Sequence, residues 1–166
     1  MVKESIPLMF LAIADIISSY FIFTPEKKQL EKEIFNALYE LCTENNSAKG
    51  QVFKGDSLKH LTNLVNRENL ACFSFLNRIC DSDDNIAIFL GRGFFTEIIH
   101  VYKKFQVKVL DDYAHAAKHM DDSNDDILDR PIDSNIDVDD WILYIILNNL
   151  FSKLLTKKFI DETSKL

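Results

Sequence analysis

The chain is poor in the two residues that most often form turns: its 166 residues include only 4 Gly and 3 Pro. Average usage would supply roughly three times as many. A turn-rich β-sandwich or a glycine-loop nucleotide site is therefore not expected. The only candidate strands, Val52-Phe53 and Phe105–Leu110, are too short or fit a helix better.

Cysteine is also scarce, and no CxxC spacing occurs. Cys42, Cys72 and Cys80 are odd in number and lie among apolar residues. This usage is typical of buried thiols in a reducing compartment, so we expect a cytoplasmic protein without disulfides.

Uninterrupted apolar runs of membrane-spanning length are missing as well. The segment Ile6–Phe23 superficially resembles a signal sequence or a membrane anchor, but Asp15 interrupts it, and Trp141–Phe151 is too short to cross a bilayer. We expect Ile6–Phe23 to be a buried core helix and the chain to have no membrane span.

Acidic residues are concentrated in one segment. The net charge is −7, and residues 110–140 alone carry eleven Asp against Lys118 and Arg130, leaving +2 for the rest. No basic stripe is present, so nucleic acid is not an expected partner. Pro131 lies within the segment, and we expect an acidic loop at about residues 121–138.

Helical patterns cover most of the remaining chain. The clearest follows Thr24-Pro25-Glu26, a strong start signal, with Leu30, Ile34, Leu38 and Leu41 on one face. Glu31 is expected on the outside of that helix. The pattern predicts one all-α domain over residues 1–166, a bundle of about seven helices. The expected helices cover residues 7–23, 25–44, 56–66, 70–80, 85–105, 107–120 and 138–159, and Gly50 and Gly55 are expected to bracket a loop.

The final helix is apolar on nearly every side over Trp141–Leu147. We therefore expect its first turns to lie deep in the core. Thirteen Phe residues could fill one core or leave an apolar patch for a homodimer.

A set of potential metal ligands lies near the acidic segment. Asp111, His115, His119 and Asp122 fall on one helical face, and imidazole and carboxylate groups both suit zinc. No glutamate between the histidines supplies a metalloprotease base. We favour a solvated polar face and predict no metal or other cofactor. No nucleophile elbow or P-loop occurs, so an enzyme is not expected.

The segment Asn85–Lys104, NIAIFLGRGFFTEIIHVYKK, carries a Gly-Arg step followed by aromatic and β-branched residues. It resembles the central helix of the Bcl family of apoptosis regulators. That family has Asn-Trp-Gly-Arg at this place. Gly91 and Arg92 match the second half of the motif, while Phe89-Leu90 replaces the first half.

Two further features are similar to that family. Trp141, at the head of a later apolar helix, resembles the tryptophan of the family's later homology region, and the order of the helices fits. The abundance of Asn, Asp, Ile, Lys and Phe resembles that of divergent members from AT-rich large DNA viruses. The resemblance implies a bundle around a central apolar helix and a viral inhibitor of host apoptosis or innate signalling, acting in the host-cell cytoplasm.

The resemblance also implies a binding mode, in which an apolar groove receives an amphipathic helix of a protein partner. Arg92 would pair with an aspartate of that helix, and Gly91 would permit close approach. The residues implied for the groove wall are Leu38, Leu41, Phe94 and Phe95. The simpler interpretation is that Gly91 and Gly93 admit a neighbouring core helix and that Arg92 is an ordinary exposed charge.

Two alternatives come from other classes of protein. The segment MFLAIADIISSYFIFTPEKKQLEKEIF is similar to the helix hairpin of bacterial tellurite-resistance-type domains, which implies metal binding through Asp15 and Glu26. The third possibility is an immunity-type protein whose acidic surface neutralises a basic partner.

Overall fold

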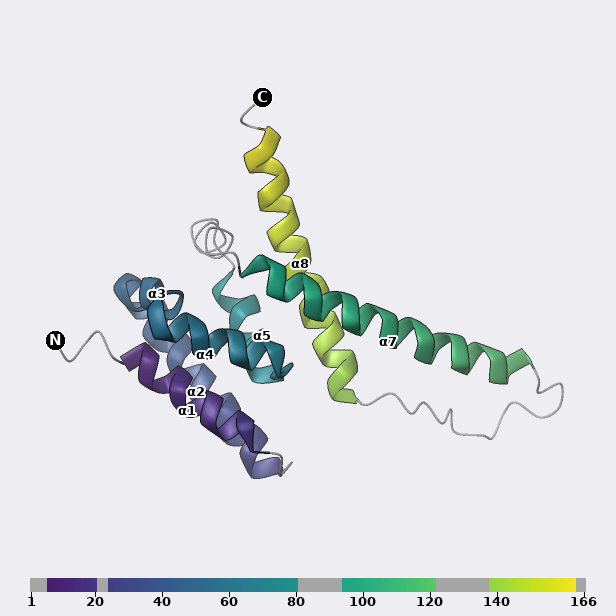
Figure 1. Ribbon diagram of the computed structural model, residues 1–166, viewed down its shortest axis with the longest axis horizontal. Coiled ribbons are helices and arrows are strands. Elements are labelled where there is room, and N and C mark those ends of the chain that lie inside the picture. The colour runs from purple at the N-terminus through teal and green to yellow at the C-terminus, as the bar shows by residue number, and fades with distance from the viewer. Residues whose placement is uncertain (1–5, 21–23, 81–93, 122–137, 164–166) are drawn as a thin grey trace.

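The computed structural model describes residues 6–20, 24–80, 94–121 and 138–163 (Figure 1). These residues form seven α-helices and no strand, which confirms the predicted all-α class. The helices are α1 (Ile6–Ser19), α2 (Pro25–Glu44), α3 (Asn46–Val52), α4 (Gly55–Asn66), α5 (Leu70–Ile79), α7 (Phe95–Asp121) and α8 (Val138–Thr163).

Side-chain caps fix the starts of three helices, namely α2, α3 and α5. Thr24 Oγ1 accepts a hydrogen bond from Lys27 N at the start of α2, as its sequence predicts. Asn69 Oδ1 accepts from Cys72 N at the start of α5. The chain reverses between α4 and α5 through Glu68, which has a φ of 59°.

The expected loop between Gly50 and Gly55 is wrong in part, because a further helix, α3, extends through Val52 and α4 begins at Gly55. Asn45, which we expected to end α2 without continuation, also caps the next helix: its Oδ1 accepts from Ser47 N at 2.9 Å and from Ala48 N at 3.4 Å. Ala48 and Val52 are buried one turn apart, so a single apolar row holds this short helix on the core.

Helix α5 lies at the centre of the packing, with α2 and α8 against it, while α1 packs on α2 and α4 (Figure 1). Its Phe73, Phe75 and Leu76 are 0–1% exposed. The ring of Phe75 lies 5.6 Å from that of Phe35 on α2. On the other side, Lys153 of α8 donates a hydrogen bond to the carbonyl oxygen of Asn77.

The expectation that α1 is a buried core helix is wrong in part. Leu11 and Ala14 are fully buried, but Met9, Ile13 and Ile16 are 41–57% exposed. One face of α1 meets α2 and α4, and the opposite face is apolar and open.

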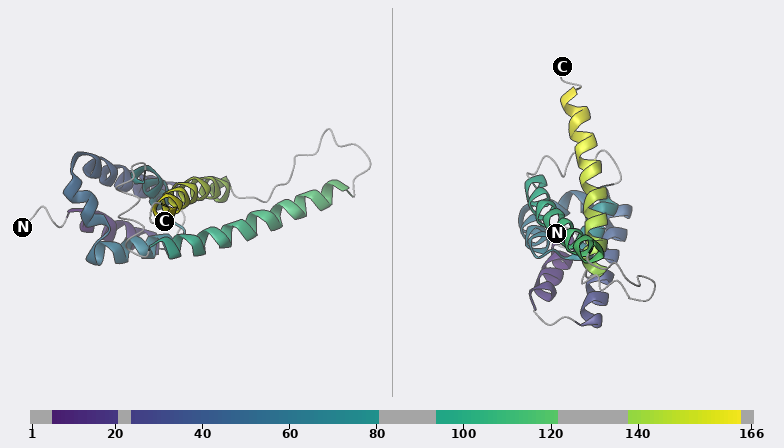
Figure 2. Two further views of the ribbon diagram at one scale, coloured as in Figure 1. Left: turned by 90° about the horizontal axis from the view of Figure 1, so that it is seen from above. Right: turned by 90° about the vertical axis from the view of Figure 1, so that its right-hand side faces the viewer.

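Helix α8 likewise buries one face rather than its whole circumference. Its buried residues are Leu143, Leu147, Leu150 and Leu154, whereas Ile142 and Ile145 are 42% and 61% exposed. The second half of α7 extends away from the other helices (Figure 2), so it cannot cover that open face of α8.

No helix in the part of the chain described here is long and apolar enough to cross a membrane. Residues 122–137 of the expected acidic loop lie outside the described residues.

The three cysteines are buried and form no disulfide, as expected. Burial raises the pKa of the Cys42 thiol to about 11, and it raises that of Cys72 further because its site is fully enclosed. A thiol must ionise to react. We therefore expect no reaction of the native protein with Ellman's reagent over minutes at pH 8, and three equivalents in denaturant. Immediate reaction of any thiol in the native protein would contradict this packing.

Candidate functional site: a hollow between α2, α5 and α8

A hollow of about 540 Å³ opens where the first half of α2 approaches α5, α7 and the start of α8. One wall is apolar and comes from the last three of these helices. Half of the charged lining residues lie on α2, and the others are Arg67 and Glu68 after α4 and Asp139 and Asp140 at the start of α8. The apolar wall consists of Leu70, Ala71, Phe105, Ile142, Leu143 and Ile146. The charged wall of α2 consists of Lys27, Lys28, Glu31 and Lys32.

Glu31 is the unusual member of this lining, because it is an acid at a core-facing position. The residue is only 8% exposed, and its Oε1 atom is buried without a hydrogen-bond partner. Burial raises the pKa of this carboxyl group, and the charge of Lys27 and a hydrogen bond with Asn69 offset that only partly.

The position of Glu31 corrects the sequence-based assignment of the faces of α2. The sequence placed Leu30 on the inner face and Glu31 outside. Instead Leu30 is 46% exposed, and Glu31 shares the buried face with Ile34, Phe35 and Leu38. Residues three, four and seven positions apart lie on one side of a helix, so Glu31 belongs geometrically to the row that these three apolar residues define.

Asn69 connects the hollow to neighbouring helices. It caps α5, its Nδ2 donates to Ser18 Oγ at 3.3 Å, and it contributes to the hydrogen bonding of Glu31. Asn69 is itself 7% exposed. This amide therefore serves α1, α2 and α5 at once, and it fixes one end of the charged wall.

Ion pairs surround the opening. Lys28 of α2 pairs with Asp139 of α8, and both residues line the hollow. Elsewhere on the rim, Glu68 pairs with Lys104 and Asp140 pairs with Lys108. The lysines of these pairs are 49–64% exposed, so each pair contributes at most about 1 kcal/mol. The main effect of these ion pairs is to neutralise charges at the rim of the hollow, and they contribute little to the stability of the helix packing.

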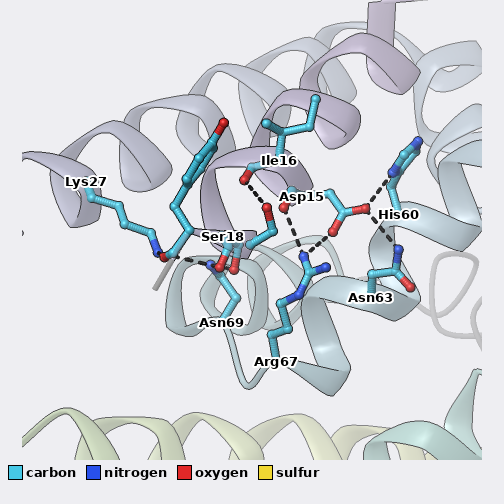
Figure 3. A network of polar contacts seen from close by, with 10 residues as sticks. Asp15, Ile16, Ser18, Lys27, His60, Asn63, Arg67 and Asn69 are labelled. Atoms are coloured by element: carbon cyan, nitrogen blue, oxygen red, sulfur yellow. Dashed lines mark hydrogen bonds and ion pairs between the residues drawn. The ribbon is translucent and has the colours of Figure 1, made fainter. Parts of the chain in front are cut away.

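A second polar cluster joins α1 to α4 (Figure 3). One carboxylate oxygen of Asp15 lies 2.7 Å from His60 Nδ1 and accepts from Asn63 Nδ2 at 2.9 Å. Arg67 pairs with the other oxygen and donates to the backbone carbonyl of Asp15 at 2.9 Å. Burial alone would raise the pKa of Asp15, but the hydrogen bonds from Asn63, His60 and Arg67 and the Arg67 charge hold it below its usual value. We call these four residues the α1–α4 latch.

The residues implied by the family resemblance do not gather at the hollow. Leu38 and Phe94 are buried in the core at 0% and 2% exposure, and Leu41 is half-buried at the far end of α2. Phe95 begins α7, but its side chain is outside the described part. Gly91 and Arg92 lie outside the described residues altogether.

The candidate metal ligands are only partly described. Asp111 is exposed on α7, and His115 and His119 are on the same helix without a described side chain. Asp122 lies outside the described residues. In the described parts of the chain, no group of three His, Cys, Asp or Glu side chains is placed to hold a metal.

Asp15 and Glu26, the two acids implied by the metal-binding alternative, lie in different environments. Asp15 is the centre of the α1–α4 latch, where protein donors serve both carboxylate oxygens. Glu26 is exposed in the first turn of α2.

No family model, curated protein or solved structure matches this chain.

Proposed function

We propose that this chain is a non-enzymatic helical interaction protein that receives an amphipathic helix of a partner protein in the hollow between α2, α5 and α8. The observation that carries the proposal is the mixed lining of the hollow, which combines six apolar residues of α5, α7 and α8 with eight charged residues, four of them on α2. An amphipathic helix presents the same combination, with apolar anchors at i, i+3, i+4 and i+7 beside polar residues.

The dimensions and exposure of the hollow support this proposal. Its volume of about 540 Å³ is in the range of sites that enclose a small molecule, about 300–1,000 Å³, so it has room for the anchoring side chains of a helix rather than for the whole helix. Ile142 lines it and is 42% exposed, so burying its side chain against a partner would remove apolar surface from water.

The biological setting that we propose is that of a divergent Bcl-like protein: a viral inhibitor of host apoptosis or innate signalling, in the host-cell cytoplasm. The support is the resemblance of the Gly91-Arg92 segment and the order of the helices. The groove of this proposal differs from the one implied by the resemblance, because it uses the first half of α2 and the start of α8.

The proposal is tested by fluorescence polarisation with labelled amphipathic helix peptides, including pro-apoptotic helices. We expect binding in the micromolar range or tighter. Ile142→Glu should weaken it at least about tenfold, because a carboxylate would be buried against the apolar face of the peptide.

Ile145→Glu is the matched control. It makes the same change one helical turn away on α8, at a residue that is 61% exposed and does not line the hollow. Its affinity should remain within about twofold of the wild type. No binding by any peptide at tens of micromolar, or equal losses in the two variants, would contradict the proposal.

A further inference from the structure

The lining of the hollow contains an acceptor that no other described residue satisfies. In the described residues, the buried side-chain atoms without a hydrogen-bond partner are Oε1 of Glu31, Oε1 of Gln51 and Oδ1 of Asn77. Of these three residues, Glu31 alone is ionisable and lines the hollow. A buried oxygen without a hydrogen-bond partner destabilises the fold, and it does so more when it is charged.

Most of the other charges around the hollow already have partners of opposite sign. Arg67 pairs with Asp15, Lys28 with Asp139, and Glu68 with Lys104. The amine of Lys27 donates to the carbonyl oxygens of Ser18 and Tyr20, at the end of α1. These pairings leave the carboxylate of Glu31 as the buried charge with the least compensation.

The chemistry of this acceptor selects among possible ligands. An acidic group would be repelled by the Glu31 carboxylate. A neutral donor would satisfy the oxygen but would add nothing to the partial charge compensation that Lys27 gives. An ammonium or guanidinium group supplies both hydrogen-bond donors and a positive charge. The terminal torsion of Glu has a broad two-fold profile, so either oxygen can turn toward the hollow.

We propose that the partner helix carries a lysine or arginine among its apolar anchors, and that this cation binds the Glu31 carboxylate in the lining of the hollow. This inference rests on the proposed function and specifies the chemistry of the partner. The apolar anchors of the partner helix pack on the apolar wall, and the contact of its cation with Glu31 sets the position of the partner helix along α2. A helix without the basic residue fits the wall but leaves the buried acceptor unsatisfied.

The test uses two designed amphipathic helix peptides that differ at one residue between the apolar anchors. One has lysine there, and the other has norleucine, which keeps the aliphatic chain and removes the charge. We expect the wild-type protein to bind the lysine peptide about tenfold more tightly than the norleucine peptide, measured by calorimetry. In the Glu31→Gln variant the two affinities should agree within about threefold.

Glu33→Gln is the matched control, because it makes the same change on the exposed side of α2. It should retain the tenfold preference for lysine. Glu31→Gln keeps the shape of the side chain and removes a desolvated charge, so we expect it to fold, which circular dichroism and thermal melting will verify.

A separate readout follows the carboxyl group itself. Carbon-13 chemical shifts of Glu31 during a pH titration should show its pKa falling when the lysine peptide binds, because an adjacent cation favours the ionised form. The norleucine peptide should not lower it.

The outcomes separate this inference from the proposed function. Equal affinity of the wild-type protein for the two peptides would overturn the role of Glu31 and leave helix binding in place. A lysine preference that persists in Glu31→Gln would overturn it as well. Failure of both peptides and of the pro-apoptotic helices would contradict the proposed function, and this inference with it.

Discussion

Replacing Asp15 with alanine is expected to lower the free energy of unfolding by about 2–4 kcal/mol at neutral pH. The residue is 7% exposed, and its loss leaves Arg67, His60 and Asn63 without their shared acceptor. Arg67 and His60 are 39% and 27% exposed, so water will compensate part of the loss. Urea denaturation followed by circular dichroism measures the change.

The contribution of Asp15 should depend on pH in a defined direction. Its pKa is below the ordinary value in the folded state, so the stabilisation is present at pH values above the unfolded pKa of about 3.9. It is lost as the pH falls through the folded pKa. The difference between wild type and Asp15→Ala should therefore be constant from pH 7 to 5 and decrease below pH 4.

Glu40→Ala, at an exposed site on α2, is the control for this series and should change stability by less than about 0.5 kcal/mol. A loss of similar size in Glu40→Ala and Asp15→Ala would show that the α1–α4 latch is not what stabilises the α1–α4 contact. So would a difference that persists unchanged at pH 2.

The largest effect of a single apolar substitution is expected at Phe75. Phe75→Ala should lower the free energy of unfolding by about 3–5 kcal/mol, because it removes a ring from the helix on which both α2 and α8 pack. The side chain is 1% exposed and contacts the Phe35 ring, so rigid neighbours on α2 will not collapse fully into the space.

Phe75→Leu is the comparison that separates lost volume from lost apolar character. It keeps most of the buried surface, and the expected cost is about 1–1.5 kcal/mol. Both variants are measured by denaturant titration with the slope of the transition checked for change. A cost below 1 kcal/mol for Phe75→Ala would mean that α5 is not the centre of the core.

The sequence allowed the helices to be placed where local chemistry is strong. Thr24-Pro25 marks the start of α2, and the polar residues near Glu68 mark the break before α5. These signals depend on a few neighbouring residues, and the folded structure keeps the local conformation that they favour. Helix α3 was missed because Asn45 and Gly50 favour a loop locally, and the burial of Val52 that stabilises the helix is a tertiary effect.

The hollow could not be predicted in the same way. Its walls come from helices more than a hundred residues apart in the chain, as in the contact of Lys28 with Asp139. The one local signal was the spacing of Glu31 from Phe35 and Leu38, which places it on their face. A preference for apolar residues at inner positions pointed to Leu30 instead, because an acid is rarely buried.

The spacing of contacts along the chain has a consequence for the order of folding. The α1–α4 latch joins residues 45–52 positions apart, whereas α8 reaches α5 across 76 positions and α2 across 111. Shorter loops lose less entropy on closure, so we expect the latch to close at a lower entropic cost than the contacts of α8 with α5 and α2. The hollow is complete only when α8 has docked on α2 and α5, because all three helices line it. A ligand held there at one hundred times its dissociation constant therefore adds about 2.7 kcal/mol to the completed fold and nothing to the state that precedes it.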